Sequence, residues 1–158
     1  RARGYVSALS ALSLHGMIAQ VPRIVHVVAD RRSRRTRRTT IGTYRFHVLT
    51  PALVGGYAPA ANGTFLLATP AKAVFDTLYL GARRGRRYAH LPELVVPVGF
   101  PIRELEGWIA KVRSVPLQRA IRARWARLRD PGGTVPAPPQ SHGDRGSGPL
   151  GTRRAPTT

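Results

Sequence analysis

One stretch of fifteen residues, Leu66 to Leu80, constrains the fold more than any other part of the chain. Thr69 precedes Pro70, and a threonine cap before a proline at the first helical position is a typical helix start. The apolar stripe that follows has helical spacing and consists of Ala73, Val74, Thr77, Leu78 and Leu80. Gly81 is suited to end the helix, because glycine adopts the left-handed conformation without strain. The sequence therefore predicts a short strand, Thr64–Ala68, that leads directly into an amphipathic helix.

Two charged residues of this helix, Lys72 and Asp76, lie four positions apart. Residues at that spacing are neighbours on one helix face and can form an ion pair. From these residues alone we predict an ordinary ion pair on the helix surface.

The chain before this helix indicates a mixed order of helix and strands. Ser7 is a suitable cap for a short helix that ends at Gly16. Residues Arg23–Ala29 and Ile41–Leu49 are rich in β-branched and aromatic side chains, which is typical of strands. The segment between them, Arg31–Arg38, holds six arginines in eight positions. We therefore predict that the two strands form a β-hairpin with a basic tip.

The second of these strands has two different faces. Side chains alternate along a strand, so Tyr44, Phe46 and Val48 share one face. Thr43, Arg45 and His47 share the other face. We expect the aromatic face to belong to the core, which leaves these rings little use for stacking on RNA bases.

The chain after the central helix predicts an edge strand and two more helices. Leu94–Val98 is typical of an edge strand, because Pro97 has no N–H to donate to a neighbour. Apolar residues at helical spacing predict a helix over Ile102–Val112. Ser114 is a suitable cap for a last helix that starts around Pro116.

This order of elements predicts a mixed α/β (α+β) domain with a small mixed or antiparallel sheet, flanking helices and further helices at the C-terminal end. A chain of 158 residues is long enough for one domain with a single core. We assign residues 1–130 to that domain. Proline, glycine, serine and threonine dominate residues 131–158, so we expect a disordered tail there.

Charge and composition narrow the classes of function. The 26 basic residues outnumber the 7 acidic ones, which gives a net charge of +19. Residues 1–130 alone carry 23 basic and 6 acidic side chains, so the charge belongs to the predicted domain. Such a charge favours nucleic acid or an acidic protein as partner. Cysteine is absent, which suits a cytoplasmic protein, and no apolar run approaches the roughly 20 residues that span a membrane.

Motifs for catalysis, metal binding and cofactor binding are missing from the sequence. The five histidines form no H-E-x-x-H pair, and no G-x-S-x-G elbow or glycine-rich phosphate loop occurs. Glu104 and Glu106 are close in the chain, but on a helix they point about 200° apart. We therefore expect a binding protein rather than an enzyme, with no cofactor.

Four motifs follow one another between about Tyr5 and Trp108. They are Y-V-S-x-x-S-A-L-x-x-H-G-M-I from Tyr5, Y-R-F-H from Tyr44 with G-G-Y from Gly55, A-T-P-x-K-A-x-x-D-x-x-Y-L from Ala68, and L-P-E-L from Leu91. In this order they resemble the AbiE-type antitoxins, which are bacterial transcriptional regulators of type IV toxin–antitoxin systems in phage defence. Ala71 departs from the pattern, because the family usually carries glutamate there.

The resemblance implies a function and a set of partners. Members of this family join an N-terminal winged helix-turn-helix, which binds operator DNA, to a C-terminal antitoxin domain that neutralises a nucleotidyltransferase toxin. The chain resembles the C-terminal domain, and we expect no winged helix-turn-helix in the residues present. The expected partners are the cognate toxin and operator DNA, without a membrane. The motif residues that the resemblance marks are Tyr5, Ser7, His15, Gly16, Lys72, Asp76 and Tyr79.

We expect the basic clusters, with one histidine, to contact the partner. These residues are Arg31, Arg32, Arg34, Arg35, Arg37, Arg38, Arg45, His47, Arg83, Arg84, Arg86 and Arg87. Three mechanisms stay open: an antitoxin that contacts its toxin, a DNA-binding regulator that contacts phosphates, and an RNA- or ribosome-associated basic protein. For His15 and His47, a structural role and a role in partner contact are both open.

Overall fold

In the computed structural model of the protein, the described residues are 4–29, 36–83 and 91–129. They form six strands, four α-helices and one 3-10 turn. In chain order these are β1 (Gly4–Val6), α1 (Ala8–Leu14), β2 (Ile24–Ala29), β3 (Thr36–Thr39), β4 (Gly42–Val48), η1 (Pro51–Leu53), β5 (Tyr57–Pro59), β6 (Leu66–Ala68), α2 (Pro70–Arg83), α3 (Ile102–Ala110) and α4 (Val115–Arg129). This order confirms the predicted mixed α/β class.

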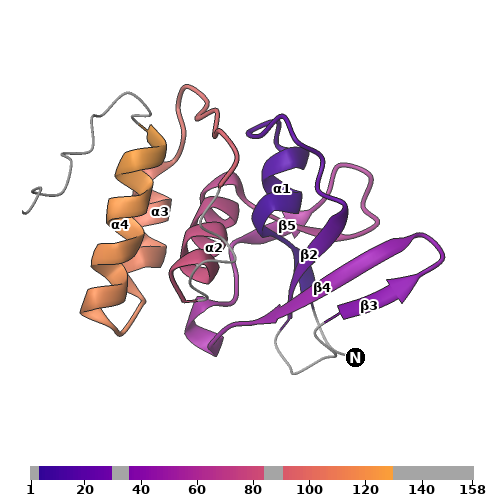
Figure 1. Ribbon diagram of the computed structural model, residues 1–158, viewed down its shortest axis with the longest axis horizontal. Helices are drawn as coiled ribbons and strands as arrows, with labels where there is room; N and C mark the ends of the chain where they lie inside the picture. Colours follow the sequence, from indigo (N-terminus) through magenta and orange to yellow (C-terminus); the bar gives the residue numbers. More distant parts are fainter. Residues whose placement is uncertain (1–3, 30–35, 84–90, 130–158) are drawn as a thin grey trace, which may run out of the picture.

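The strands build one mixed sheet in the order β3-β4-β2-β1-β6-β5. Strand β2 pairs in parallel with β4, and β1 pairs in parallel with β6, whereas the other neighbours are antiparallel. Helix α2 lies between the sheet and the α3–α4 pair, so that α3 and α4 form an outer layer (Figure 1). The core fills the space between the sheet, α1 and α2, and continues between α2 and the outer layer.

The predicted hairpin between Arg23–Ala29 and Ile41–Leu49 is wrong. Strand β2 pairs with β4 in parallel, and β4 instead forms its hairpin with β3. The turn of that hairpin is Thr40–Ile41, because a two-residue connection closes an antiparallel pair more readily than the long arginine segment does. Strand β3 therefore forms the outer edge of the sheet.

The predicted inner face of β4 is also wrong. His47 is fully buried, whereas Val48 is 39% exposed and Tyr44 and Phe46 are half-buried. The register explains this result, because His26 and Val28 of β2 lie beside Arg45 and His47 of β4 and share their face. Both His26 and Val28 are buried. The helices thus cover the face that carries His47.

Helix α2 begins as predicted. The Thr69 hydroxyl accepts a hydrogen bond from the Lys72 N–H at 3.2 Å, which confirms the cap, and Pro70 occupies the first position. The helix does not end at Gly81 but runs to Arg83. The eleven residues 71–81 are all buried. Packing on every side of this helix outweighs the low helix propensity of one glycine.

The C-terminal elements agree with the sequence in part. Helices form over Ile102–Ala110 and Val115–Arg129, and Ser114 caps the second one. Residues 94–98 form no strand; instead the Val95 N–H donates to the Met17 carbonyl at 2.8 Å. The predicted tail, 131–158, lies outside the described residues. No helix among the described residues is long and apolar enough to cross a membrane.

Candidate partner-binding surface and the buried motif network

Four of the motif residues meet in one buried network. Asp76 accepts hydrogen bonds from the Ser7 hydroxyl at 2.6 Å and from the Tyr5 hydroxyl at 3.3 Å. Its other oxygen lies 2.7 Å from the Lys72 Nζ atom. Tyr5 and Ser7 come from the first strand and the residue after it, so the network fastens β1 to helix α2.

Lys72 is enclosed by aromatic rings and by backbone. Its Nζ atom donates to the Leu53 carbonyl at 2.5 Å and lies 4.4 Å from the Trp108 ring centroid and 4.7 Å from that of Phe75. A cation over a ring face is attracted by the ring quadrupole. The side chains of Lys72 and Asp76 are both 0% exposed. The prediction of a surface ion pair is therefore wrong, because α2 is buried on the face that carries the pair.

Burial and pairing act on these charges in opposite directions. Burial lowers the pKa of Lys72 and raises that of Asp76, and each partner's charge counteracts the shift of the other. Burial and the nearby Asp76 charge raise the pKa of Tyr5. The ion pair is buried, and its hydrogen bonds to Tyr5 and Ser7 join the first strand region to α2.

The remaining motif residues also make structural contacts. The Nε2 atom of His15 lies 2.7 Å from the Ala68 carbonyl oxygen and joins the end of α1 to β6. Gly16 has a φ of 68°, which favours glycine, and it follows α1 as predicted. The Tyr79 hydroxyl accepts a hydrogen bond from Arg83 at 3.4 Å. Ser7 precedes α1, but its hydroxyl binds Asp76 and does not cap the helix.

Two histidines form a pair beneath the helices. The Nδ1 atom of His26 lies 2.9 Å from Nε2 of His47, and the two rings are parallel within 1°. Burial lowers the pKa of His26 to about 4, and the charge of Arg45 adds to this effect. His47 is fully buried, which favours the structural role among the two that the sequence leaves open for it. The alternation in Tyr44-Arg45-Phe46-His47 was the available sequence signal. From it we assigned the face of Tyr44 and Phe46 to the core, whereas the core lies on the face of His47.

The arginines predicted to bind a partner fall into two groups. Arg31, Arg32, Arg34, Arg35, Arg84, Arg86 and Arg87 lie outside the described residues. Arg37 and Arg38 lie exposed on the edge strand β3, Arg45 is half-buried on β4, and Arg83 is exposed at the end of α2. Arg37, Arg38 and Arg45 lie on the paired strands β3 and β4, whereas Arg83 belongs to helix α2.

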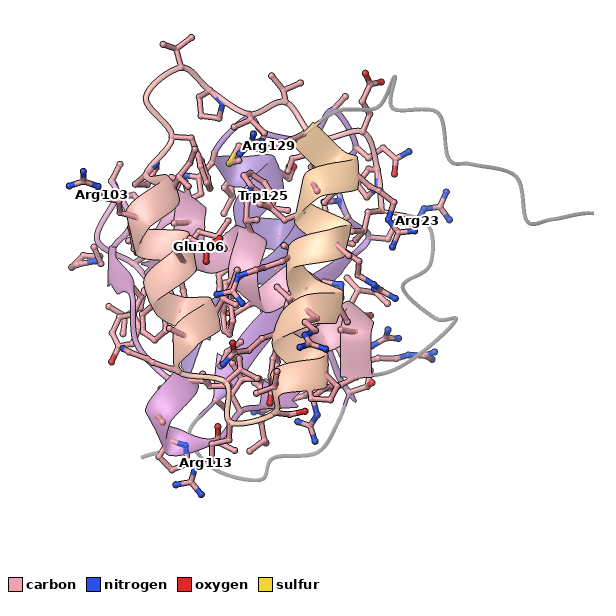
Figure 2. The ribbon with its side chains drawn as sticks, turned by 90° about the vertical axis from the view of Figure 1, so that its left-hand side faces the viewer. Arg23, Arg103, Glu106, Arg113, Trp125 and Arg129 are labelled. Atoms are coloured by element: carbon pink, nitrogen blue, oxygen red, sulfur yellow. The ribbon has the colours of Figure 1, made fainter. Side chains whose placement is uncertain are left out.

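A basic surface that we did not select from the sequence lies on the outermost helix. We call it the arginine face, and it consists of Arg119, Arg122, Arg124, Arg127 and Arg129. Helix α4 contains no carboxylate, and Glu106 of α3 pairs with Arg122 at 3.1 Å. Figure 2 looks directly onto this layer, with Trp125 and Arg129 near one end of α4 and Arg113 at the opposite end of the layer. The signal was present in the sequence, because Ile121 and Trp125 point inward and leave four of the arginines exposed and Arg124 half-buried.

A second basic feature is a hollow of about 580 Å³ beside the start of α4. We call it the basic hollow. Its cations are Arg83, Lys111 and Arg113, its hydroxyls include that of Ser114, and its apolar floor includes Leu53 and Tyr79. The three cations come from the end of α2, the end of α3 and the connection between α3 and α4.

Among the described residues, no group of three or more metal-ligating side chains comes together. Comparisons of the chain with protein-family models, curated proteins and solved structures found no match.

Proposed function

We propose that the protein is an antitoxin domain of the AbiE type, which binds a nucleotidyltransferase toxin in the bacterial cytoplasm and neutralises it in phage defence. It acts by contact and catalyses no reaction. In this proposal the domain belongs to a regulator that also represses transcription of its own operon.

The meeting of distant motifs in one network carries the proposal. Tyr5 and Asp76 are 71 positions apart in the chain, yet their side chains are hydrogen bonded. Ser7 and Lys72 join the same carboxylate. Four of the seven motif residues that carry the resemblance thus join the sheet to α2. This supports a resemblance of the whole domain rather than of a single amphipathic helix.

The arginine face supports an acidic partner. Five arginines in a helix of fifteen residues, with no carboxylate among them, repel one another and favour a partner that brings negative charge. Glu106 neutralises Arg122 in part, but both side chains are 44% exposed and a pair this exposed contributes little. The guanidinium fork binds carboxylate and phosphate in a bidentate manner. We therefore place the toxin contact on this face.

The test is co-expression with the nucleotidyltransferase that the proposal predicts to be encoded next to this gene. We expect the toxin alone to arrest growth, the wild-type chain to restore it, and the two proteins to co-purify. The double variant Arg119→Glu/Arg127→Glu should lose both effects. Arg37→Glu/Arg38→Glu changes the charge equally on the edge strand β3, so it serves as the matched control and should retain them.

The possible outcomes test the antitoxin function and the location of the toxin contact separately. If the wild-type chain neither restores growth nor retains the toxin, the antitoxin function is refuted. If the β3 variant fails and the α4 variant succeeds, the contact lies on the edge strand. Melting curves of both variants serve as the folding control. They should match that of the wild type, because the four substituted arginines are all exposed.

A second candidate function is DNA binding through phosphates, and the same arginine face favours it. Asparagine and glutamine are scarce in the chain, so little direct reading of bases is expected. Binding to a short labelled DNA duplex would then fall steeply with salt, with a slope of about 0.9 per neutralised phosphate. The Arg119→Glu/Arg127→Glu variant should reduce that slope by about 2. Flat salt dependence would refute this function.

A further inference from the structure

The basic hollow brings together cations from two separate parts of the chain. Arg83 is the last residue of α2, whereas Lys111 and Arg113 belong to the connection between α3 and α4. Among the described residues, the ion pairs within 4.0 Å are Lys72–Asp76 and Arg122–Glu106, and neither involves these three cations. No carboxylate lines the hollow. Three basic residues therefore line one hollow that no carboxylate lines.

Neighbouring rings hold two of the cations in place. The Lys111 Nζ atom lies 3.9 Å from the Trp108 ring centroid, and the Arg83 guanidinium carbon lies 5.5 Å from that of Tyr79. The Arg83 side chain also donates to the Tyr79 hydroxyl at 3.4 Å. Ordered cations lose less side-chain entropy when they bind an anion than freely moving ones do.

The start of α4 adds a further attraction for anions. Ser114 and Leu117 line the hollow, and the Leu117 N–H donates to the Ser114 hydroxyl at 3.4 Å, which is the cap of the helix. Pro116 has no N–H, so this end of α4 attracts an anion mainly through the helix dipole. Helix α4 has fifteen residues, so its dipole is fully developed.

We propose that the basic hollow binds the polyphosphate group of a nucleoside triphosphate. The cations and the α4 terminus contact the phosphates, and the apolar floor around Leu53 and Tyr79 receives the nucleoside. A volume of about 580 Å³ is that of a typical small-molecule site. Basic and apolar residues both line the hollow, which suits the two chemically different halves of a nucleotide. This inference goes beyond toxin binding, and the chain alone suffices to test it.

The experiment is calorimetric titration of the full chain at physiological salt. The probes are ATP, GTP, CTP and UTP, then tripolyphosphate as the phosphate part alone and adenosine as the nucleoside part alone. We expect the triphosphates to bind more tightly than tripolyphosphate, and adenosine not to bind measurably. Arg113→Gln should weaken the binding about tenfold, because a charge-assisted contact is lost.

The matched control is Arg103→Gln, which removes the same charge at the far end of α3 (Figure 2). It should leave the affinity within about twofold of wild type, since only general charge attraction changes. Lys111→Gln provides a second test in case one side chain dominates. Equal weakening by Arg103→Gln and Arg113→Gln would overturn the site, because binding would then reflect net charge alone. Tripolyphosphate binding as tight as ATP binding would overturn the nucleoside part.

Discussion

The buried pair of Lys72 and Asp76 makes a quantitative prediction about the variant Asp76→Asn. Asparagine keeps the shape of the side chain and can still accept a hydrogen bond from Ser7, but it removes the negative charge. Lys72 then keeps only the Leu53 carbonyl and the aromatic rings as partners. The Lys72 ammonium group then carries a buried charge without a counter-charge, because its side chain is 0% exposed to water.

The expected loss is large compared with total stability. Removing one partner of a buried ion pair costs about 3–5 kcal/mol, and domains of this size are stable by roughly 5–15 kcal/mol. This corresponds to a fall in Tm of roughly 10–20 °C. Urea unfolding followed by circular dichroism measures the free energy directly. Glu106→Gln breaks the exposed pair with Arg122 and should cost less than about 1 kcal/mol.

The pH dependence of Asp76→Asn gives a second measure. Burial lowers the pKa of Lys72, and losing Asp76 lowers it further. Between that pKa and the usual value of 10.5, the unfolded chain binds a proton that the folded chain does not. The variant should therefore become more stable as the pH rises towards 10.5. The double variant Lys72→Met/Asp76→Asn holds no buried charge and should recover most of the loss.

If the free energy of unfolding of Asp76→Asn lies within about 1 kcal/mol of the wild-type value, the variant holds no unpaired buried charge, because such a charge costs more than that. If the double variant is no more stable than Asp76→Asn, the loss comes from packing and not from charge.

Two further predictions concern backbone crowding and acid stability. Gly56 and Gly63 have φ angles of 66° and 67°, but a Cβ at Gly56 would lie 2.8 Å from Trp108, whereas one at Gly63 meets nothing within 4 Å. Gly63→Ala should lower the free energy of unfolding by about 1 kcal/mol because of the φ angle alone. Gly56→Ala should lower it by about 1–3 kcal/mol more, because its Cβ also meets Trp108. Urea unfolding measures both losses, and equal losses would contradict the contact with Trp108. Because the pKa of His26 falls to about 4 on folding, the unfolded chain binds the proton first, and stability should decrease as the pH falls from 6.5 to 4. Unfolding curves across that pH range should show the free energy of unfolding change by up to about 3 kcal/mol. The variant His26→Gln should lose this pH dependence.

Local signals in the sequence predicted the helices well. The Thr69–Pro70 start and the Ser114 cap are short-range features, and both lie where the sequence places them. The end of α2 was less predictable, because burial on all sides carries the helix past Gly81. A cap depends on neighbours in the chain, whereas the end of a buried helix depends on neighbours in space.

Strand pairing and strand faces were not predictable from the same local signals. Parallel pairing of β2 with β4 requires the intervening β3 to move to the outer edge, and no local pattern specifies that. His47 is a polar residue, so alternation alone assigned it to the outside of the sheet. Its burial depends on His26 of another strand, which provides a hydrogen-bonding partner.

The position of α2 between the sheet and the outer helices means that other elements enclose its buried ion pair on two sides. Trp108 of α3 covers Lys72 from one side, and Tyr5 and Ser7 of the first strand region satisfy Asp76 from the other. A fragment that lacked the outer helices would open the ammonium group to water, and one that lacked the first strand would remove two donors from the carboxylate. Gene fusions or truncations that preserve folding must therefore keep both flanks of α2 together.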